Sequence, residues 1–288
     1  MGFFASVNGD IVPAHEARVS VLDNGFTFGD SVYEVLRTHA GRPFETDRHL
    51  RRLRVSAARL GIEVTPSDAE LLAQLSALLE RGGEGESYVR IIVTRGVGDS
   101  SYDFDAVAGP TVVMILKDLP ARPERHYAEG IRVAVVEVRR NHPRSLDPAI
   151  KSSNLLNNIL AVREARSRGA EEPLMLSLDG HLAEGASTNV FLARGGVVRT
   201  PPLATGILAG ITRDVVREIA PRLGIECREE PLRLDDLLAA EEAFLTSTTR
   251  DVVPVREVDG TKVGDGRPGP LTRRLMEGFR AYVAERCS

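Results

Sequence analysis

Cysteine is scarce in this sequence, and several common signals are missing. The two cysteines, Cys227 and Cys287, lie far apart and form no CxxC pair, so they predict reduced thiols and a cytoplasmic setting rather than a disulfide framework. No apolar run approaches the roughly 20 residues needed to span a bilayer, and no basic segment leads into an apolar one at the N-terminus. We therefore expect a soluble protein without a membrane partner.

An excess of positive charge is also missing. The formal net charge of -4 gives no basic field that would attract nucleic acid, so a nucleic-acid partner is not expected. The sequence shows no internal repeat and no low-complexity tract. With 288 residues the chain can form one large or two ordinary domains and can enclose a pocket.

Apolar periodicity predicts helices and strands in no strict alternation. Leu50, Leu53, Ala57 and Leu60 recur at helical spacing, and a second helix is expected near residues 67–81. The stretches YVRIIVTRG (88–96) and TVVMILKDL (111–119) are β-branched and predict neighbouring strands. The proline-containing stretch KDLPARPERHY (117–127) is the best linker in the chain. The pattern restarts beyond it, which favours a mixed α+β or α/β pair of domains.

A lysine stands between a proline-interrupted approach and a predicted helix in SLDPAIKSSNLLNNILAVREA (145–165). Lys151 is flanked by Ile150, Ser152, Ser153 and Asn154 rather than by charges. A nucleophilic amine must be neutral part of the time, which favours a partly buried setting with few competing charges. Taken alone, the segment also fits a surface lysine at the start of a helix.

A carboxylate and two candidate phosphate-binding segments follow. Glu184 precedes a Gly-Ala-Ser-Thr turn in HLAEGASTNVF (181–191), where it could face a pyridine nitrogen or simply solvate a loop. TGILAGITRDVVREIA (205–220) predicts a helix whose first backbone N–H groups, at Gly210, Ile211 and Thr212, favour phosphate. In FLTSTTRDVVPV (244–255) the hydroxyls of residues 246–249 could ligate phosphate or close a turn.

Together, a lysine, a carboxylate and a phosphate cradle are the parts of a pyridoxal phosphate site. The whole chain also resembles a fold-type IV pyridoxal phosphate aminotransferase, the group that contains D-amino acid aminotransferases, branched-chain aminotransferases and aminodeoxychorismate lyases. The resemblance rests on VSVLDNGFTFGDSVYEVLRT, IKSSNLLNNILAVREA, AEGASTNVF, GILAGITRDVV and FLTSTTRDVVPV.

The resemblance assigns roles to residues at matching positions. It implies that Lys151 binds the cofactor pyridoxal 5′-phosphate covalently and moves the proton at the substrate α-carbon, and that Glu184 pairs with the pyridine nitrogen. Arg52, the backbone of Ile211 and Thr212, and Thr248 would hold the phosphate, and Tyr33 would lie near the substrate. No metal ion is implied.

The resemblance also implies how the chain is organised. We expect a small N-terminal α/β domain over residues 1–118, a linker at 119–125, and a larger α/β domain over residues 126–288, with the cofactor between the two domains. Members of this group are usually homodimers, so a homodimer is expected. The substrates would be amino donors and 2-oxo acids.

Substrate choice is less strongly marked. The sequence as a whole is most similar to D-amino acid aminotransferases. A D-amino acid such as D-alanine is therefore expected as amino donor, with 2-oxoglutarate or pyruvate as acceptor. In those enzymes an arginine and a histidine after TRG bind the substrate carboxylate, whereas the corresponding stretch here, VGDSSYDF (97–104), has neither. That departure leaves room for (R)-configured primary amines as donors.

Three alternatives remain. The first is a branched-chain L-amino acid aminotransferase, because Tyr88 and Arg90 match a tyrosine and a pocket arginine of those enzymes. Arg90 could also stand at a strand edge without contacting the substrate. A lyase acting on aminodeoxychorismate is the second alternative. A non-catalytic pyridoxal phosphate carrier or a phosphate-binding protein of the same fold is the third, but a carrier would not need both Lys151 and Glu184.

Overall fold

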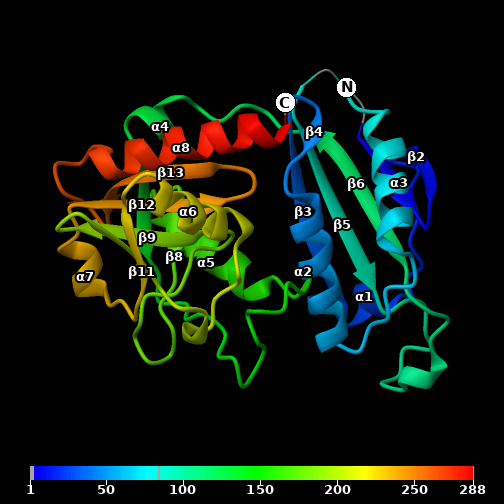
Figure 1. Cartoon of the computed structure of the whole chain (residues 1–288). Helices are drawn as coiled ribbons and strands as arrows, with labels where there is room; N and C mark the ends of the chain where they lie inside the picture. Colours follow the sequence, from blue (N-terminus) through cyan, green and yellow to red (C-terminus); the bar gives the residue numbers. More distant parts are fainter. Residues whose placement is uncertain (1–2, 84, 288) are drawn as a thin grey trace. The chain divides into compact units, whose positions relative to one another are not determined.

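The computed structural model describes residues 3–83 and 85–287, which fall into two units. Unit 1 consists of Met1–Pro120, Ile150–Asn154 and Arg286–Ser288, and unit 2 consists of Ala121–Ala149 and Leu155–Glu285. Both units contain helices and strands, as the mixed sequence pattern predicts (Figure 1). Within the described ranges, no helix has the length and apolar content needed to cross a membrane.

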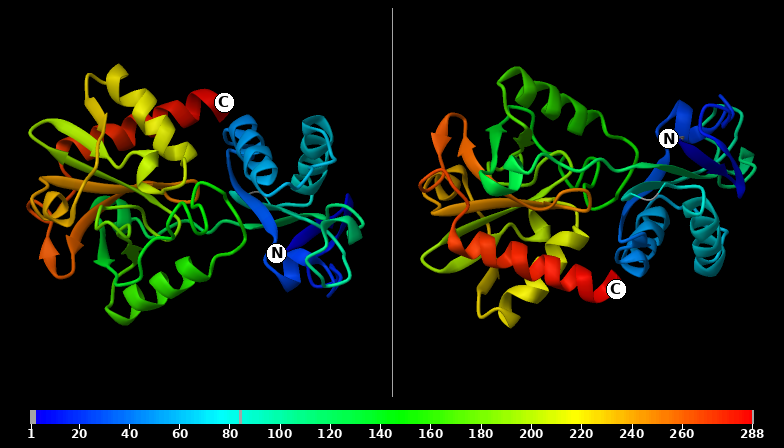
Figure 2. Two further views of the ribbon diagram at one scale, coloured as in Figure 1. Left: turned by 90° about the horizontal axis from the view of Figure 1, so that it is seen from below. Right: turned by 90° about the horizontal axis from the view of Figure 1, so that it is seen from above.

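Unit 1 is built on a six-stranded sheet with the order β2-β1-β6-β5-β3-β4, whose neighbouring strands are all antiparallel. Helices α2 and α3 lie on one face of it (Figures 1 and 2). The strands β5 and β6 pair as predicted. The elements are β1 (Phe4–Val7), β2 (Asp10–Pro13), α1 (Asn24–Thr27), β3 (Ser31–His39), β4 (Arg42–Pro43), α2 (Thr46–Arg59), α3 (Asp68–Leu79), β5 (Ser87–Thr94) and β6 (Val112–Asp118).

The helices of unit 1 begin and bury their faces for clear local reasons. Ser67 caps α3 and exchanges hydrogen bonds with Glu70 in a capping box, so the helix begins where the sequence predicts. In α2, Leu50, Leu53 and Ala57 are buried at the predicted helical spacing. They pack in one apolar cluster with the inward-facing residues of β3, β5 and β6.

Strand β3 alternates between a buried and a partly exposed face. Its buried face carries Val32 and Leu36, but also the carboxylate of Glu34, which is fully inaccessible to solvent. A buried charge at a core position requires partners. The opposite, partly exposed face carries Tyr33 and Val35.

The segment Ile150–Asn154 belongs to unit 1, although the sequence places it in the domain expected over residues 126–288. The physical reason is backbone pairing: Ser152 forms an antiparallel bridge with Val32 in β3. A strand-like contact of this kind cannot be read from the apolar pattern, because the segment is too short to show a period.

Unit 2 is built on a second sheet, with the order β11-β10-β9-β12-β13-β7-β8 and with β14 paired to β13. Helix α5 lies on one side of this sheet, and α6 and α8 lie on the other (Figure 2). The elements are α4 (Arg125–Ala128), β7 (Ile131–Val135), α5 (Leu156–Ser167), β8 (Glu172–Leu174), β9 (Asn189–Arg194), β10 (Val197–Thr200), α6 (Ile211–Arg222), β11 (Glu226–Glu229), α7 (Leu234–Leu238), β12 (Glu242–Ser247), β13 (Asp251–Val258), β14 (Thr261–Lys262) and α8 (Pro270–Cys287).

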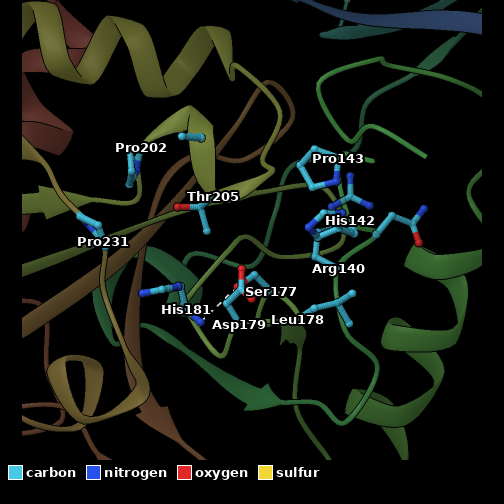
Figure 3. Close-up of a pocket in the computed structure, with 12 residues that line it drawn as sticks. Arg140, His142, Pro143, Ser177, Leu178, Asp179, His181, Pro202, Thr205 and Pro231 are labelled. Atoms are coloured by element: carbon cyan, nitrogen blue, oxygen red, sulfur yellow. Dashed lines mark hydrogen bonds between the residues drawn. The ribbon is translucent and has the colours of Figure 1, made fainter. Parts of the chain in front are cut away.

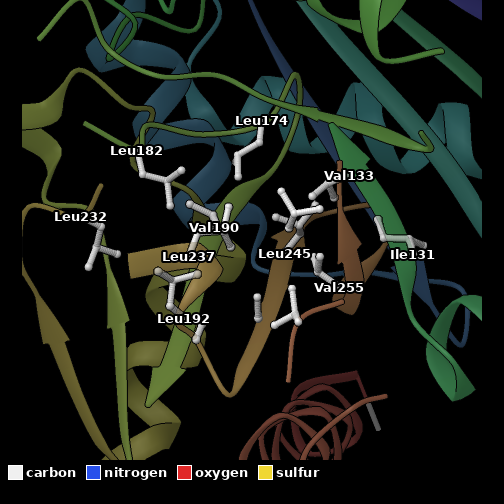
Figure 4. Close-up of a cluster of buried hydrophobic side chains, with 14 of the residues drawn as sticks. Ile131, Val133, Leu174, Leu182, Val190, Leu192, Leu232, Leu237, Leu245 and Val255 are labelled. Atoms are coloured by element: carbon white, nitrogen blue, oxygen red, sulfur yellow. The ribbon is translucent and has the colours of Figure 1, made fainter. Parts of the chain in front are cut away.

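The core of unit 2 lies on the β7, β9, β12 and β13 strands (Figure 4). Val190, Leu192 and Leu245 are among its buried residues, each at most 2% exposed. The central strands are buried on both faces, which explains their nearly continuous apolar runs. This packing fixes the ends of β9 and β12, where the candidate functional residues of unit 2 lie.

Candidate active site

Lys151 is held along the first residues of strand β3. The backbone N–H of Tyr33 donates to the carbonyl oxygen of Lys151 at 2.9 Å, and the N–H of Ser153 donates to the carbonyl oxygen of Ser31 at 2.9 Å. The N–H of Lys151 donates to the hydroxyl of Ser56 at 3.2 Å. Backbone hydrogen bonds on both sides of the lysine therefore fix the point from which its side chain extends.

Two cationic side chains lie over the ring of Tyr33. The Nζ atom of Lys151 is 4.5 Å from the ring centroid, and the guanidinium carbon of Arg90 is 4.1 Å from it. The register of β3 and β5 explains the second contact, because Tyr33 pairs with Ile92 and Val35 pairs with Arg90. Arg90 and Tyr33 are thus diagonal neighbours on the partly exposed face. The structure brings together Lys151, Tyr33 and Arg90, which the sequence singled out separately.

Arg90 retains hydrogen-bonding capacity. Its Nε atom is buried and makes no hydrogen bond to any residue that the structure describes. Tyr88 is two residues away on the same face of β5, and burial raises the pKa of its phenol, an effect that Arg90 partly offsets. Tyr88 therefore keeps its proton at neutral pH and can donate it in a hydrogen bond. Lys117 lies over its ring, 4.4 Å from the centroid.

The stretch after β5 adds no further cation to this face. Residues 97–104 contain no arginine, lysine or histidine. Arg95, just before them, is committed elsewhere: it pairs with Asp30 and donates to the carbonyl oxygen of Leu60 at 2.7 Å. Tyr102, within the stretch, is 84% exposed.

Arg52 lies on α2 and forms a two-point ion pair with Glu34. Its Nε donates to Oε1 of Glu34 at 2.6 Å, and its Nη2 donates to Oε2 at 2.9 Å. His49, one turn earlier in α2, contacts the same carboxylate, with Nδ1 2.7 Å from Oε2. Burial alone would raise the pKa of Glu34, but Arg52 and His49 outweigh it and hold that pKa well below its usual range.

In unit 2, Glu184 is surrounded by hydrogen-bond donors. Arg140 donates from Nε to Oε1 at 2.8 Å, while Asn189 Nδ2 and the backbone N–H of Leu208 each donate to Oε2 at 3.1 Å. The carboxylate is nearly inaccessible, with 6% of the side chain exposed. These donors stabilise negative charge on Glu184, which is the state needed to pair with a protonated pyridine nitrogen.

The start of α6 is arranged for close approach of a ligand. Gly210 is the N-cap residue and provides no side-chain cap, so the first N–H groups of the helix, including those of Ile211 and Thr212, have no partner within the helix. A Cβ atom on Gly210 would lie 1.9 Å from Oδ1 of Asn189. Glycine is therefore required here, and it places the helix start directly beside the amide that holds Glu184.

Unsatisfied hydroxyls mark the end of β12. The Oγ1 atom of Thr246 and the Oγ atom of Ser247 are buried, and neither has a hydrogen-bond partner within the described chain. Thr248 follows in the turn between β12 and β13. Buried polar atoms without partners carry a desolvation cost, so the hydroxyl of Ser247 at the end of the strand indicates a place suited to a polar ligand.

The sequence did not indicate a role for four residues of this arrangement: Glu34, His49, Arg140 and Asn189. One of them has a signal in the sequence, because Glu34 occupies a core position in the alternation of β3 between Val32 and Leu36. Arg140 lies far from Glu184 in the chain, and nothing local predicts its contact.

A cavity of about 250 Å³ lies next to Arg140 in unit 2 (Figure 3). Arg140, His142 and Pro143 form one side of it, and the turn that carries Ser177, Asp179 and His181 forms another. None of the residues that the sequence singled out lines this cavity. Arg140 lines the cavity and also donates a hydrogen bond to Glu184.

Comparison with known proteins identifies the family. The amino-transferase class IV family matches residues 31–258. A Methanocaldococcus jannaschii protein assigned as a branched-chain-amino-acid aminotransferase is 39% identical over 274 residues, 95% of this chain and 94% of that protein. The D-alanine aminotransferase of Bacillus licheniformis is 36% identical over 276 residues, 96% of this chain and 95% of that enzyme.

A solved structure agrees over the whole fold. The branched-chain aminotransferase from the thermophilic archaeon Thermoproteus uzoniensis, with norvaline, matches at a TM-score of 0.92 and 32% identity, covering 99% of this chain and 96% of that one. The chain therefore belongs to the class IV aminotransferases, which confirms the resemblance and the fold seen in the sequence. It is a pyridoxal phosphate-dependent transaminase.

The residues present fit pyridoxal phosphate. The buried hydroxyl of Ser247, the last residue of β12, finds no partner among the described residues, and a phosphate group would supply one. The uncapped start of α6 offers N–H groups and a positive dipole end, which favour the same group. Glu184 presents a carboxylate stabilised by three donors, as a pyridinium partner requires.

Proposed function

We propose that this enzyme transfers the amino group of a branched-chain L-amino acid to a 2-oxo acid. The observation that carries the proposal is the position of Arg90: its guanidinium lies 4.1 Å from the ring centroid of Tyr33, and the Nζ atom of Lys151 lies 4.5 Å from the same centroid. A cation whose buried Nε has no partner among the described residues thus contacts the same aromatic ring as the reacting amine. Arg90 binds the substrate carboxylate in place of the arginine and histidine absent from residues 97–104.

The surroundings of Arg90 suit an aliphatic side chain. Val35 and Ile92 lie on the same face of the sheet as Tyr33, and each is only partly buried. A leucine, isoleucine or valine substrate would cover this apolar surface while its carboxylate pairs with Arg90. Tyr88 adds a hydroxyl donor beside the guanidinium.

The remaining roles follow the resemblance and serve one cofactor. When bound, pyridoxal phosphate supplies a ring that accepts the negative charge left when the substrate α-carbon loses its proton. Lys151 holds the cofactor covalently and, once released by the donor amine, moves that proton as base and then acid. Glu184 keeps the pyridine nitrogen protonated. The phosphate is bound by Arg52, by the backbone of Ile211 and Thr212, and by Thr248.

A second candidate is a D-amino acid such as D-alanine. The observation in its favour is the 36% identity to the D-alanine aminotransferase of Bacillus licheniformis over nearly the whole chain. Against it stands the stretch 97–104, which lacks the carboxylate-binding arginine and histidine. An (R)-configured primary amine has no carboxylate and would need no such cation as donor. A lyase acting on aminodeoxychorismate would instead release pyruvate from its substrate.

We further propose that two copies of the chain form a homodimer and that the enzyme works in the cytoplasm. Large apolar side chains are exposed on unit 1, with Val21 at 71%, Phe26 at 75% and Phe104 at 67%. Exposed apolar side chains of this size would suit burial against a second copy. Both cysteines are unpaired, which suits a reducing compartment. Light scattering of the purified protein tests the dimer, and a monomer at working concentration would refute it.

The cofactor half-reaction tests the donor. The purified enzyme with bound cofactor is mixed separately with L-leucine, D-alanine and (R)-1-phenylethylamine, and loss of the visible absorption of the lysine-bound cofactor is followed. We expect rapid loss with L-leucine and slow or no loss with the other two. Rapid loss with D-alanine alone would replace the proposal by the D-specific one, and no loss with any donor would favour the lyase.

A further inference from the structure

We propose that Glu34 and His49 are positioning residues that orient Arg52 toward the phosphate group of the cofactor. The inference rests on the proposed role of Arg52 and goes beyond it, because neither partner contacts the cofactor in this account. Glu34 comes from β3 and His49 from α2, so the cluster also joins the strand that holds Lys151 to the helix that carries Arg52.

The geometry of the ion pair selects one orientation of the guanidinium. Nε and Nη2 of Arg52 donate to the two oxygens of Glu34 at 2.6 and 2.9 Å. This two-point contact uses one edge of the planar fork, so the Nη1 end faces away from the carboxylate. A single-point contact would leave the guanidinium free to rotate. The arrangement therefore fixes the orientation of the Arg52 guanidinium.

His49 fixes the carboxylate in turn. Its Nδ1 lies 2.7 Å from Oε2 of Glu34, and 1% of its side chain is exposed. Burial lowers the pKa of His49, with Arg52 and Lys151 adding to the effect, although Glu34 opposes it. Since a carboxylate oxygen can only accept, Nδ1–H of His49 donates to Glu34. Because Oε2 also receives the backbone N–H of Val35 at 3.3 Å, the carboxylate cannot rotate without losing several bonds.

An ordinary structural ion pair would share much of this geometry, and the two roles differ in what they affect. A purely structural pair stabilises the fold and would change the binding of every cofactor form alike. A positioning pair specifically affects ligands that carry the phosphate. The negative charge of Glu34 would also repel phosphate, so removing it has an opposing electrostatic effect that the experiment must separate from position.

Binding of two cofactor forms to the cofactor-free protein separates these possibilities. The dissociation constants of pyridoxal phosphate and of pyridoxal, which lacks the phosphate, are measured by calorimetry, and their ratio is the readout. Glu34→Gln removes the charge, whereas Glu34→Asp keeps the charge but shortens its reach. Glu242→Gln is the matched control, since Glu242 is a buried carboxylate in unit 2 that accepts the N–H groups of Leu271 and Thr272.

We expect both Glu34 variants to weaken pyridoxal phosphate by about tenfold relative to pyridoxal. The control should leave the ratio unchanged, even where it lowers the unfolding midpoint. His49→Phe should weaken phosphate preference in the same direction, and His49→Asn, whose amide can still donate, should restore most of it. Since no amino donor is present, the outcome does not depend on substrate choice.

Several results would overturn the inference. Equal weakening of both cofactor forms in the Glu34 variants would mean a structural pair. Tighter binding of pyridoxal phosphate by Glu34→Gln, with Glu34→Asp unchanged, would mean that charge repulsion dominates. Arg52→Gln is run in parallel: a changed ratio there with unchanged ratios in the Glu34 and His49 variants would overturn the positioning role alone. An unchanged ratio in Arg52→Gln would remove the proposed phosphate contact itself.

Discussion

The carbonyl oxygen of Lys151 accepts a hydrogen bond of 2.9 Å from the backbone N–H of Tyr33. This bond attaches the lysine segment to the edge of a sheet from a distant part of the chain. It also explains the small polar neighbours, because Ser152 and Ser153 allow the short segment to lie against β3 at the bridge with Val32. The point from which the lysine side chain extends is therefore set by backbone hydrogen bonds.

Replacing Lys151 with alanine should abolish turnover without unfolding the protein. The backbone bonds to Tyr33 and Ser56 do not involve the side chain, so Lys151→Ala should keep the wild-type circular dichroism spectrum. The visible absorption of the lysine-bound cofactor should disappear, because the amine that binds it is gone. Lys262→Ala, at an exposed position in β14, is the control and should behave as wild type. Persistent turnover in Lys151→Ala would remove the central assignment.

Adding a single methyl group at Gly210 should impair the cofactor site. In Gly210→Ala the new Cβ would lie 1.9 Å from Oδ1 of Asn189, so the amide that donates to Glu184 must move. We expect a loss of about 1–3 kcal/mol in the free energy of unfolding, with weaker cofactor binding. Urea unfolding and cofactor titration measure the two effects. Gly85→Ala, where nothing lies within 4 Å of the added Cβ, should change neither; wild-type binding in Gly210→Ala would refute the close approach.

Arg140 should be needed to keep Glu184 in place. Arg140→Gln loses a charged donor at 2.8 Å from a nearly buried carboxylate, and such bonds contribute about 1.5–3 kcal/mol. We expect kcat to fall by roughly tenfold or more, since the loss of about 1.4 kcal/mol corresponds to tenfold. The neighbouring Arg139→Gln controls for the loss of charge, because Arg139 donates to the carbonyl oxygen of Val136 instead. Wild-type kcat in Arg140→Gln would mean that the ion pair between Arg140 and Glu184 does not support the chemistry.

Acid should destabilise the fold through the partly buried His39. Burial, with a contribution from Arg37, lowers the pKa of His39 to about 4 from its unfolded value near 6.5. Below pH 6.5 the unfolded chain therefore binds a proton that the folded chain refuses, so stability falls as the pH drops from 6.5 toward 4 and this contribution levels off below 4. Because the ring is only half buried, we discount the full shift to about 1 kcal/mol.

Urea midpoints at about pH 7.5 and about pH 5 test this effect, because the two values lie above and within the window of the linkage. His39→Gln should lose less stability between the two conditions than wild type does. His15→Gln, at an exposed histidine, should follow wild type. An unchanged pH dependence in His39→Gln would contradict the assignment.

Much of the fold could be predicted from the sequence, because its signals are local. The capping box at Ser67 and the apolar spacing of Leu50, Leu53 and Ala57 each act within a few turns. The glycine that begins α6 and the hydroxyls that end β12 are likewise local, and both appear where predicted. The place of Ile150–Asn154 in unit 1 could not be predicted, since it depends on pairing with a strand more than a hundred residues earlier.

In the candidate site, too, residues with local sequence signals could be predicted and long-range contacts could not. Lys151, Glu184 and Arg52 lie in recognisable motifs, whereas their partners do not. Arg140 donates to Glu184 across 44 residues of sequence, and no period or cap links the two. Glu34 is the exception, because a carboxylate at an inward position of an apolar strand already requires a buried cation.

The most direct test of the account is the role of Arg90 in binding the substrate carboxylate. Steady-state kinetics of wild type, Arg90→Lys and Arg90→Gln are measured with L-leucine and with (R)-1-phenylethylamine, which has no carboxylate. We expect Arg90→Gln to lower kcat/KM for L-leucine by roughly thirtyfold, a loss of about 2 kcal/mol, Arg90→Lys to lower it less, and any residual amine activity to be unchanged. Equal kcat/KM for L-leucine in wild type and Arg90→Gln would contradict it.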